Sequence, residues 1–490
     1  MADYDLAIIG GGLNGVSLAR DAAGRGLRVV LFEQGDLASA ASSASSRLIH
    51  GDLAALERRS LLRVRAALTE RDVWLRIAPH LVRPMRFAIP AHSDERPLWL
   101  LRAGLLLYDR LVPRPHLPPS TTIDVTHHPL GNALKRPFGT AFEYSDCVVD
   151  DSRLAVVTAR DAAERGADIF TGARCVRADR AEEWRLAVID RGHRRIMTAR
   201  ALANASGAWT AQVAETVLRM PLPVSRIHQT SQIVVRRLFD QDNVYVFQNR
   251  DQRLIFASPY AHDFTLIGTI GHAFKGDPAV VTTRAGDIAY LCEAANRYFR
   301  AQIGASDVVR AVAGANMAFG SVGDDGTEVA SVRLDRRRRQ APLITMFGGD
   351  VTSARARAER AVATLTPFYP MTPRWTATAP LPGGDFAWEQ FDELVDAART
   401  RWRFLAEDEA QRLFSAYGTR LAEVLGDAKS RDDLAPFFGP ELTGAEVRYQ
   451  MKREWARFPD DVLWRRTKLG LTMAPEHRDA LAVFMARGGL

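Results

Sequence analysis

The 490-residue chain has little cysteine and lacks metal-binding motifs. Its three cysteines, Cys147, Cys175 and Cys292, are far apart, which predicts neither a disulfide framework nor a cysteine-based metal site. The patterns CxxC and HExxH are also missing, so we expect no structural or catalytic metal. Scattered, unpaired thiols are typical of a reducing compartment, and we therefore expect a cytoplasmic protein.

Long apolar runs, a signal peptide and an acidic surplus are lacking too. No run of about 18 apolar residues occurs, so the sequence predicts no membrane-spanning helix, and the N-terminus lacks a basic segment and a cleavage site. Lys and Arg number 65 against 58 Asp and Glu, a net charge of +7. A basic surface attracts anionic membranes, which leaves peripheral contact with the inner membrane face open. No nucleic-acid motif is present, and we expect no such partner.

The strongest local motif is GGGLNG at residues 10–15, which follows an apolar, strand-like run and precedes a segment of helical spacing. Its glycines fall in the GxGxxG phase, at Gly10, Gly12 and Gly15, and a second apolar run ends in Glu33. In such a strand–turn–helix–strand unit the glycines let the backbone approach a pyrophosphate, and the acid accepts from a ribose hydroxyl. The motif predicts FAD or NAD rather than NADP, and does not choose between the first two.

Strand and helix patterns divide the chain into three domains. A discontinuous nucleotide domain is predicted at residues 1–75, 150–215 and 305–368, an inserted substrate domain at 76–149 and 216–304, and a helical domain at 373–490. The predicted fold class is therefore an α/β flavoprotein, with a Rossmann-like domain, an inserted antiparallel sheet and an all-α C-terminal domain. This interrupted arrangement is typical of flavoprotein oxidoreductases more than of NAD dehydrogenases.

Longer motifs follow one another along the chain: SSASSRLIHG at 42–51, FEYSDCVVDDSRL at 142–154, NASGAW at 204–209, FGGD at 347–350 and LWRRTKLG at 463–470. With them the chain resembles FAD-dependent glycerol-3-phosphate dehydrogenases of the aerobic bacterial type, within the D-amino-acid-oxidase-like flavoprotein superfamily. The likeness covers nearly the whole length. It implies FAD as the cofactor, hydride transfer from a small-molecule substrate to the flavin, and oxygen or quinone as the electron acceptor. A homodimer stays open.

The resemblance also implies which residues contact FAD. Besides the three glycines and Glu33, these are Ser42, Ser43, Ser46, His50, Gly207, Gly348, Gly349 and Thr352. We expect backbone N–H groups at the second glycine pair, ahead of a helix, to stabilise negative charge on the reduced flavin.

Departures from the family pattern gather where the family handles its substrate. Asp52 follows His50 and Gly51 where the family has H-G-G, K-G-S-H becomes QTSQ at 229–232, G-x-R-P-L becomes GANMA at 314–318, and the lysine of F-G-G-K becomes Asp350. A phosphate dianion needs arginine forks and lysines. The loss or inversion of these cations therefore predicts a substrate other than glycerol 3-phosphate.

We predict that the substrate is a neutral or cationic small molecule, an amine or a hydroxy compound. The candidate catalytic residues are His50, Asp52, Gln232, His272 and Asp350. His50 is the candidate base, and His272, which flanks an altered segment, is an alternate for proton handling. The two aspartates hold an ammonium group or are structural. Two alternatives stay open: a genuine glycerol-3-phosphate dehydrogenase with a rebuilt phosphate site, and a non-catalytic flavin-binding partner protein.

Overall fold

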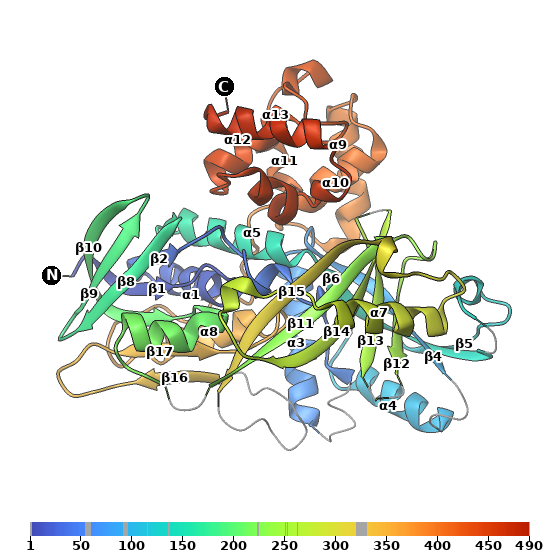
Figure 1. Cartoon of the computed structure of the whole chain (residues 1–490), viewed down its shortest axis with the longest axis horizontal. Coiled ribbons are helices and arrows are strands. Elements are labelled where there is room, and N and C mark those ends of the chain that lie inside the picture. The colour runs from blue at the N-terminus through green and yellow to red at the C-terminus, as the bar shows by residue number, and fades with distance from the viewer. Residues whose placement is uncertain are drawn as a thin grey trace.

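Two β-sheets lie side by side, and the C-terminal helices sit above them in Figure 1. The computed structural model describes residues 2–53, 60–91, 97–114, 116–135, 138–222, 225–249, 251, 253–261, 263–319 and 331–489. Part of the helix that the sequence predicts from Leu53 falls outside these ranges, at residues 54–59.

Sheet A is the nucleotide-binding sheet. Its strands are β1 (Tyr4–Ile9), β2 (Val29–Glu33), β7 (Asp168–Thr171), β8 (Ala173–Arg180), β9 (Trp184–Asp190), β10 (His193–Asn204), β16 (Ser331–Asp335) and β17 (Leu343–Phe347). The order is β16-β17-β10-β1-β2-β7, and β9 and β8 extend antiparallel from β10. The strands from β17 to β7 are parallel, so their carboxyl ends meet at one edge.

Three helices cover sheet A: α1 (Leu13–Gly24), α5 (Asp151–Glu164) and α8 (Ala354–Ala363). α1 is buried along most of its length, which its small side chains allow. Gly15 shows the tightness of this packing, because a Cβ there would lie 1.9 Å from the carbonyl oxygen of Gly10. The apolar β1 strand is equally buried, as expected for a central parallel strand.

Sheet B is the second sheet, and its strands are mostly antiparallel. They are β3 (Leu48–Ile49), β4 (Val82–Ala91), β5 (Thr121–Asp124), β6 (Thr140–Val149), β11 (Ser225–Arg236), β12 (Asn243–Gln248), β13 (Leu254–Tyr260), β14 (Phe264–Phe274) and β15 (Val308–Phe319). Helix α7 (Ala285–Tyr298) packs on one part of it, and α3 (Leu61–Ile77) and α4 (Leu98–Arg110) pack on another. Strand β15 lies within the predicted nucleotide segment 305–368, yet it pairs with β11. The strand that follows residue 305 is therefore an edge strand of sheet B.

The C-terminal part is helical. Its helices are α9 (Phe391–Arg401), α10 (Glu407–Tyr417), α11 (Leu421–Leu425), α12 (Gly444–Arg453), the π-helical turn η10 (Asp461–Arg466) and α13 (Pro475–Ala486). They enclose two apolar cores of their own. The short helical turns elsewhere include η1 (Ala41–Ser43), η3 (Gly207–Trp209), α6 (Thr210–Gln212), η4 (Val213–Val217) and η5 (Pro278–Val280). The predicted fold class, with two sheet-based domains and a helical C-terminal domain, is confirmed.

Candidate cofactor and substrate site

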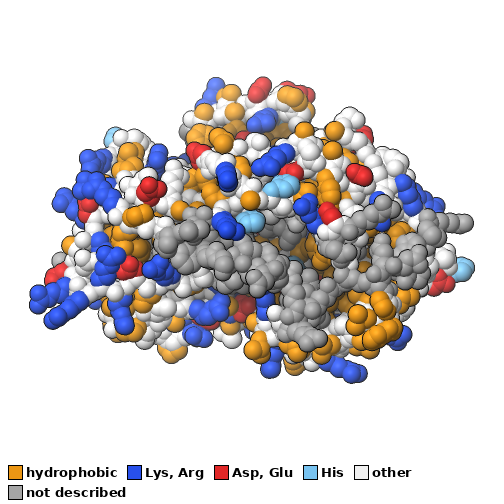
Figure 2. All heavy atoms as spheres, turned by 60° about the horizontal axis from the view of Figure 1, so that its bottom comes forward, with side chains coloured by type: hydrophobic (Ala, Val, Ile, Leu, Met, Phe, Trp, Pro, Cys, Tyr) orange, Lys and Arg blue, Asp and Glu red, His pale blue; other side chains and the backbone are white. Residues whose placement is uncertain are grey.

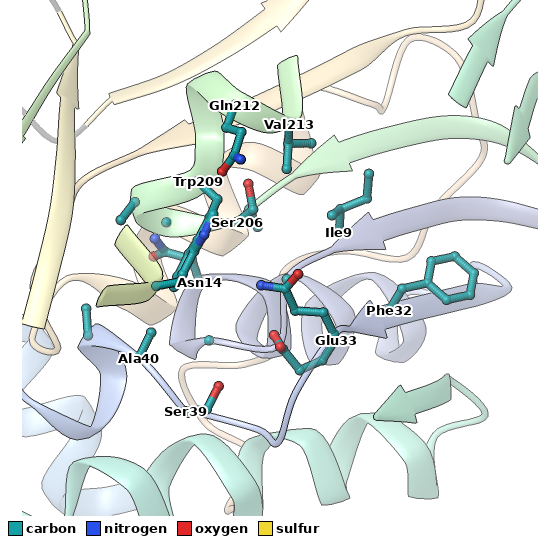
Figure 3. A pocket seen from close by; sticks show the side chains of 18 of the residues that line it. Ile9, Asn14, Phe32, Glu33, Ser39, Ala40, Ser206, Trp209, Gln212 and Val213 are labelled. Carbon is teal, nitrogen blue, oxygen red and sulfur yellow. The ribbon is translucent and has the colours of Figure 1, made fainter. Parts of the chain in front are cut away.

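A cavity of about 300 Å³ lies at the carboxyl ends of β1, β2 and β10. The chain places β2 on one side of β1 and β10 on the other, and this reversal of strand order is where open α/β sheets bind nucleotides. The lining includes the glycine turn, the end of β2, residues 39–42, residues 173–175 and residues 205–209. In Figure 3, Glu33 lies across the pocket from Ser206, Trp209 and Gln212.

The glycine turn has no room for a side chain at Gly10. Gly10 has φ +112°, and a Cβ there would lie 2.6 Å from the carbonyl oxygen of Ala205. Gly12 caps α1 without a side chain, and Ser42 Oγ accepts a hydrogen bond from the N–H of Leu13 at 2.9 Å. The open helix N-terminus and the bare backbone suit a pyrophosphate.

Glu33 is fixed at the end of β2 by backbone N–H groups. Its Oε2 accepts from Gly11 at 2.6 Å, and its Oε1 accepts from Gly35 at 2.8 Å. Burial raises the pKa of Glu33 above its ordinary value, and these two N–H groups oppose that rise. Each oxygen keeps a second lone pair, so the carboxylate can accept from a ribose hydroxyl. The residues present therefore fit the ADP half of FAD.

A second glycine turn, Gly348 and Gly349, is held by an arginine that the sequence analysis did not single out. Both glycines have positive φ, and a Cβ on Gly349 would lie 1.4 Å from Arg357 Nη1. The Arg357 guanidinium donates to the carbonyls of Gly348 and Phe347, both at 2.7 Å, and to Asn14 Oδ1 at 3.1 Å. Burial lowers the pKa of Arg357 to about 10. This side chain joins the second turn to the first turn of α1, and its only sequence signal is an arginine within a small-residue helix.

The serine loop, residues 42–46, places few of its side chains at the cofactor cavity. Ser42 lines the cavity, Ser43 Oγ donates to the carbonyl of Ala40 at 3.1 Å, and Ser46 is half-buried. The loop is anchored instead through Ser45, whose carbonyl accepts from Gln232 Nε2 at 2.7 Å. The structure thus places Gln232, a candidate catalytic residue, as a support of this loop.

His50 has a defined tautomer in this arrangement. Its backbone N–H donates to Thr352 Oγ1 at 3.3 Å, and its Nδ1 accepts from the N–H of Asp52 at 3.0 Å. Since Nδ1 is an acceptor, a neutral His50 carries its proton on Nε2 and is a donor there. This geometry does not favour the role of base that the sequence analysis gives His50. The carboxylate of Asp52 forms an ion pair with Arg63 at 3.0 Å, so its charge is compensated.

His272 lies on the other face of sheet B. Its Nε2 is 2.5 Å from Asp287 Oδ1 of α7, and Ser231 Oγ donates to the other oxygen of that carboxylate at 2.7 Å. Neighbouring strand residues point to opposite faces. Ser231 and His272 therefore face α7, whereas Gln232 faces the serine loop. The structure does not bring His272 together with His50, and its role in proton handling gains no support here.

The remaining predicted residues lie at the turn after β10 and directly after the second glycine turn. Gly207, with φ +59°, lines the cavity at the turn after β10. Thr352 is buried, and its carbonyl accepts from Trp74 Nε1 at 2.9 Å. Asp350 is exposed, and its Oδ1 accepts from the N–H of Ser353 at 2.7 Å, just ahead of α8.

Comparisons with known proteins agree with this arrangement. The chain matches the family described as FAD dependent oxidoreductase over residues 5–330, and the C-terminal domain of alpha-glycerophosphate oxidase over 374–486. A glycerol-3-phosphate dehydrogenase of Pseudomonas aeruginosa is 41% identical over 98% of this chain and 95% of its own. A D-erythritol 1-phosphate dehydrogenase of Brucella abortus is 38% identical over 99% and 98%. The crystal structure of a Bacillus halodurans glycerol-3-phosphate dehydrogenase with FAD shares the fold, with TM-score 0.78, 23% identity and coverage of 99% and 90%.

Proposed function

Because this chain belongs to the FAD-dependent glycerol-3-phosphate dehydrogenase family and is thus an FAD-dependent dehydrogenase or oxidase, we propose that it oxidises a neutral or cationic small molecule rather than glycerol 3-phosphate. FAD, when bound, accepts a hydride from a substrate C–H. An alcohol also loses its O–H proton as the C=O bond forms, whereas a neutral amine forms the C=N bond of an iminium ion and keeps its N–H protons in that step. Family membership favours an enzyme over a silent flavin-binding partner.

The observation that carries this proposal is the charge at the altered segments. The first residue after the second glycine turn is the exposed Asp350. Asn316 lines the cavity, and Gln229 is buried with its amide donating to the carbonyl of Thr282 at 2.7 Å. None of these three residues carries a positive charge, so none can form an ion pair with a phosphate. One unit charge at about 5 Å is worth about 3 kcal/mol at an effective dielectric of about 20, so each lost cation matters.

Proton handling favours an amine among the two substrate classes. Hydride loss from an alcohol leaves a protonated carbonyl, so a base must take the O–H proton. Because its Nδ1 accepts from the Asp52 N–H, a neutral His50 offers a donor at Nε2, and the Gln232 amide is neither an acid nor a base. Hydride loss from a neutral amine leaves a stable iminium ion and needs no base. A carboxylate such as Asp350 also attracts the protonated amine from solution, and this amine releases one proton to solvent before its hydride leaves.

Anaerobic mixing with candidate substrates tests the proposal through bleaching of the flavin absorbance. We expect bleaching by a primary or secondary amine and none by glycerol 3-phosphate. Asp350→Lys should raise the apparent dissociation constant of the amine at least tenfold, and Asp350→Asn should raise it less. Asp479→Lys makes the same charge change on exposed α13 and should leave it unchanged. Bleaching by glycerol 3-phosphate and not by amines would refute the proposal.

One observation favours the second candidate, a polyol-phosphate dehydrogenase with a rebuilt anion site. Arg226, Lys275 and Asp277 line an open depression of about 710 Å³, which shares Ala208, Gln212 and Asp277 with the cofactor cavity. Arg226 lies on β11 and Lys275 directly follows β14, and the two strands pair at Ile227 and Phe274. If glycerol 3-phosphate reduces the flavin, Arg226→Gln with Lys275→Gln should abolish that reduction in this candidate. Reduction that survives both changes excludes this depression as the phosphate site.

We further propose that oxygen or a quinone accepts the electrons from the reduced flavin. We also propose that the protein makes peripheral contact with an anionic membrane. Within the described ranges, no helix combines the length and apolarity that spanning a bilayer requires. Instead α3 and α4 expose apolar side chains, with Leu62 84% and Trp99 70% accessible, beside exposed Arg102 and Arg110. Figure 2 shows hydrophobic side chains gathered at its lower right, where α4 lies in Figure 1. Apolar anchors with basic neighbours suit a lipid interface.

Sedimentation with vesicles tests this contact. Vesicles rich in phosphatidylglycerol should bind the protein more tightly than neutral vesicles, and Trp99→Ser with Leu62→Ser should weaken binding at least tenfold. Ile196→Ser changes an exposed apolar residue on β10 and serves as the control. Equal binding by all three proteins would argue against this surface.

A further inference from the structure

The loop after β2 contacts the C-terminal domain through Asp36. This residue lies between two segments that line the cofactor cavity, 32–34 and 39–42. Its carboxylate accepts from Arg466 Nη1 and Nη2 at 2.7 and 2.8 Å, and from Arg465 Nε at 2.5 Å. Burial alone would raise the pKa of Asp36, but the two guanidinium groups lower it below its ordinary value. The carboxylate is therefore charged at neutral pH.

The serine loop reaches the same C-terminal segment through the start of α5. Ser45 donates to Asp151 Oδ2 from its backbone N–H at 3.2 Å and from its Oγ at 2.8 Å. The preceding Asp150 accepts from Lys468 Nζ at 2.9 Å, and Lys468 also donates to Ser152 Oγ. Residues 465–468 thus touch the supports of both loops that line the cavity.

We propose that Arg466 and Lys468 are positioning residues for FAD, through which the C-terminal domain holds both cofactor-binding loops in their binding conformation. Arg466 is rigidly placed, because its side chain is 0% exposed and also donates to the carbonyl of Glu454 at 2.6 Å. Glu454 in turn pairs with Arg153 of α5 at 2.5 Å. A loop held in the bound shape before FAD arrives avoids an ordering cost on binding. Removing Arg466 takes two hydrogen bonds from the buried Asp36 carboxylate and leaves it the bond from Arg465, so the loop is held less firmly.

If Arg466 only held the two domains together, losing another contact of the same interface should weaken FAD binding equally. Arg160 of α5 joins the same two domains, through Glu423 at 3.1 Å and Tyr449 at 3.3 Å. These contacts lie on α11 and α12, and the residues of α5 that support the serine loop are at its other end. Arg160→Met therefore matches Arg466→Met in chemistry and in its effect on the domain interface.

The experiment measures two quantities on full-length protein: the FAD dissociation constant, by titrating apoprotein and following flavin fluorescence, and the melting temperature of the apoprotein. We expect Arg466→Met to raise the FAD dissociation constant at least tenfold, with an apoprotein melting temperature like that of Arg160→Met. Arg466→Lys should recover part of the affinity, and Arg160→Met should bind FAD like the wild type.

The proposal is overturned if Arg466→Met binds FAD as tightly as the wild type, or if Arg160→Met weakens FAD binding equally. If Arg466→Met does not fold, Lys468→Met is judged by the same two criteria. Because FAD binding is measured without substrate, the result is independent of which compound the enzyme oxidises.

Discussion

Acid should destabilise this protein through one buried histidine, His80. Its residue exposure is 1%, and neither ring nitrogen has a hydrogen-bond partner among the described residues. Burial, with a smaller contribution from the Arg153 guanidinium, lowers the pKa of His80 from its ordinary 6.5 to about 3. The ring lies against the C-terminal part of the chain, since a Cβ on Gly418 would come within 3.1 Å of its Cγ.

The sign and size of the effect follow from linkage. The unfolded chain protonates His80 below pH 6.5, whereas the folded chain does so only near pH 3. The neutral ring therefore contributes its full stability above pH 6.5, and that stability is lost as the pH falls. The slope is about 1.4 kcal/mol per pH unit, so the loss between pH 6.5 and pH 5 is about 2 kcal/mol. This is a large part of a net stability on the order of 5–15 kcal/mol.

Equilibrium urea unfolding at about pH 7.5 and about pH 5 measures the loss. His80→Asn removes the titrating group, so its free energy of unfolding should fall by about 2 kcal/mol less than that of the wild type over this interval. His127→Asn replaces a histidine whose side chain is 87% exposed and should follow the wild type. The comparison uses the change with pH, so a constant packing cost cancels. Identical losses in His80→Asn and the wild type would refute the reasoning.

Two further substitutions test the packing of the glycine turn and a buried hydroxyl that contacts Gly51. Gly15→Ala places a Cβ 1.9 Å from a backbone oxygen, and overpacking of about 1–3 kcal/mol should raise the FAD dissociation constant about 5- to 150-fold in a flavin titration. Gly104→Ala adds a Cβ that has no atom within 4 Å apart from its own helix, and this variant should bind FAD normally. Tyr108→Phe removes a buried hydroxyl that accepts from Gly51 at 2.8 Å and donates to Asp146 at 2.6 Å. It should cost about 1–3 kcal/mol in urea unfolding, and a cost below about 0.5 kcal/mol would contradict this.

The part of the site around the glycine turn was predictable because its residues are close in sequence. Gly10, Gly15 and Glu33 belong to one β–α–β unit, and the periods of two and 3.6 residues place them without knowledge of the rest of the chain. The fold class followed for the same reason, since each sheet consists of strands with a clear local pattern. A strand pattern does not tell which of two sheets a strand joins, and β15, which follows residue 305, joins sheet B.

The tertiary partners could not be predicted, because no local signal marks them. Arg357 reaches Asn14 across 343 residues, and Arg466 reaches Asp36 across 430. The tautomer of His50 depends on one backbone N–H, that of Asp52, which has the positive φ of +55°. A sequence pattern of serines and histidines names such residues as candidates, but only the fold shows which of them contact the cofactor loops.

Net charge is the clearest case of information that position must supply. The surplus of +7 suggests a chain rich in cations for an anionic substrate. Several arginines are nevertheless fully buried and bind carboxylates or carbonyls inside the protein: Arg20, Arg71, Arg153, Arg357 and Arg466. These guanidinium groups fix turns and domain contacts, and a phosphate group cannot reach them. The net charge therefore does not tell which charges a substrate meets, and only the fold shows that an exposed carboxylate, that of Asp350, lies ahead of α8.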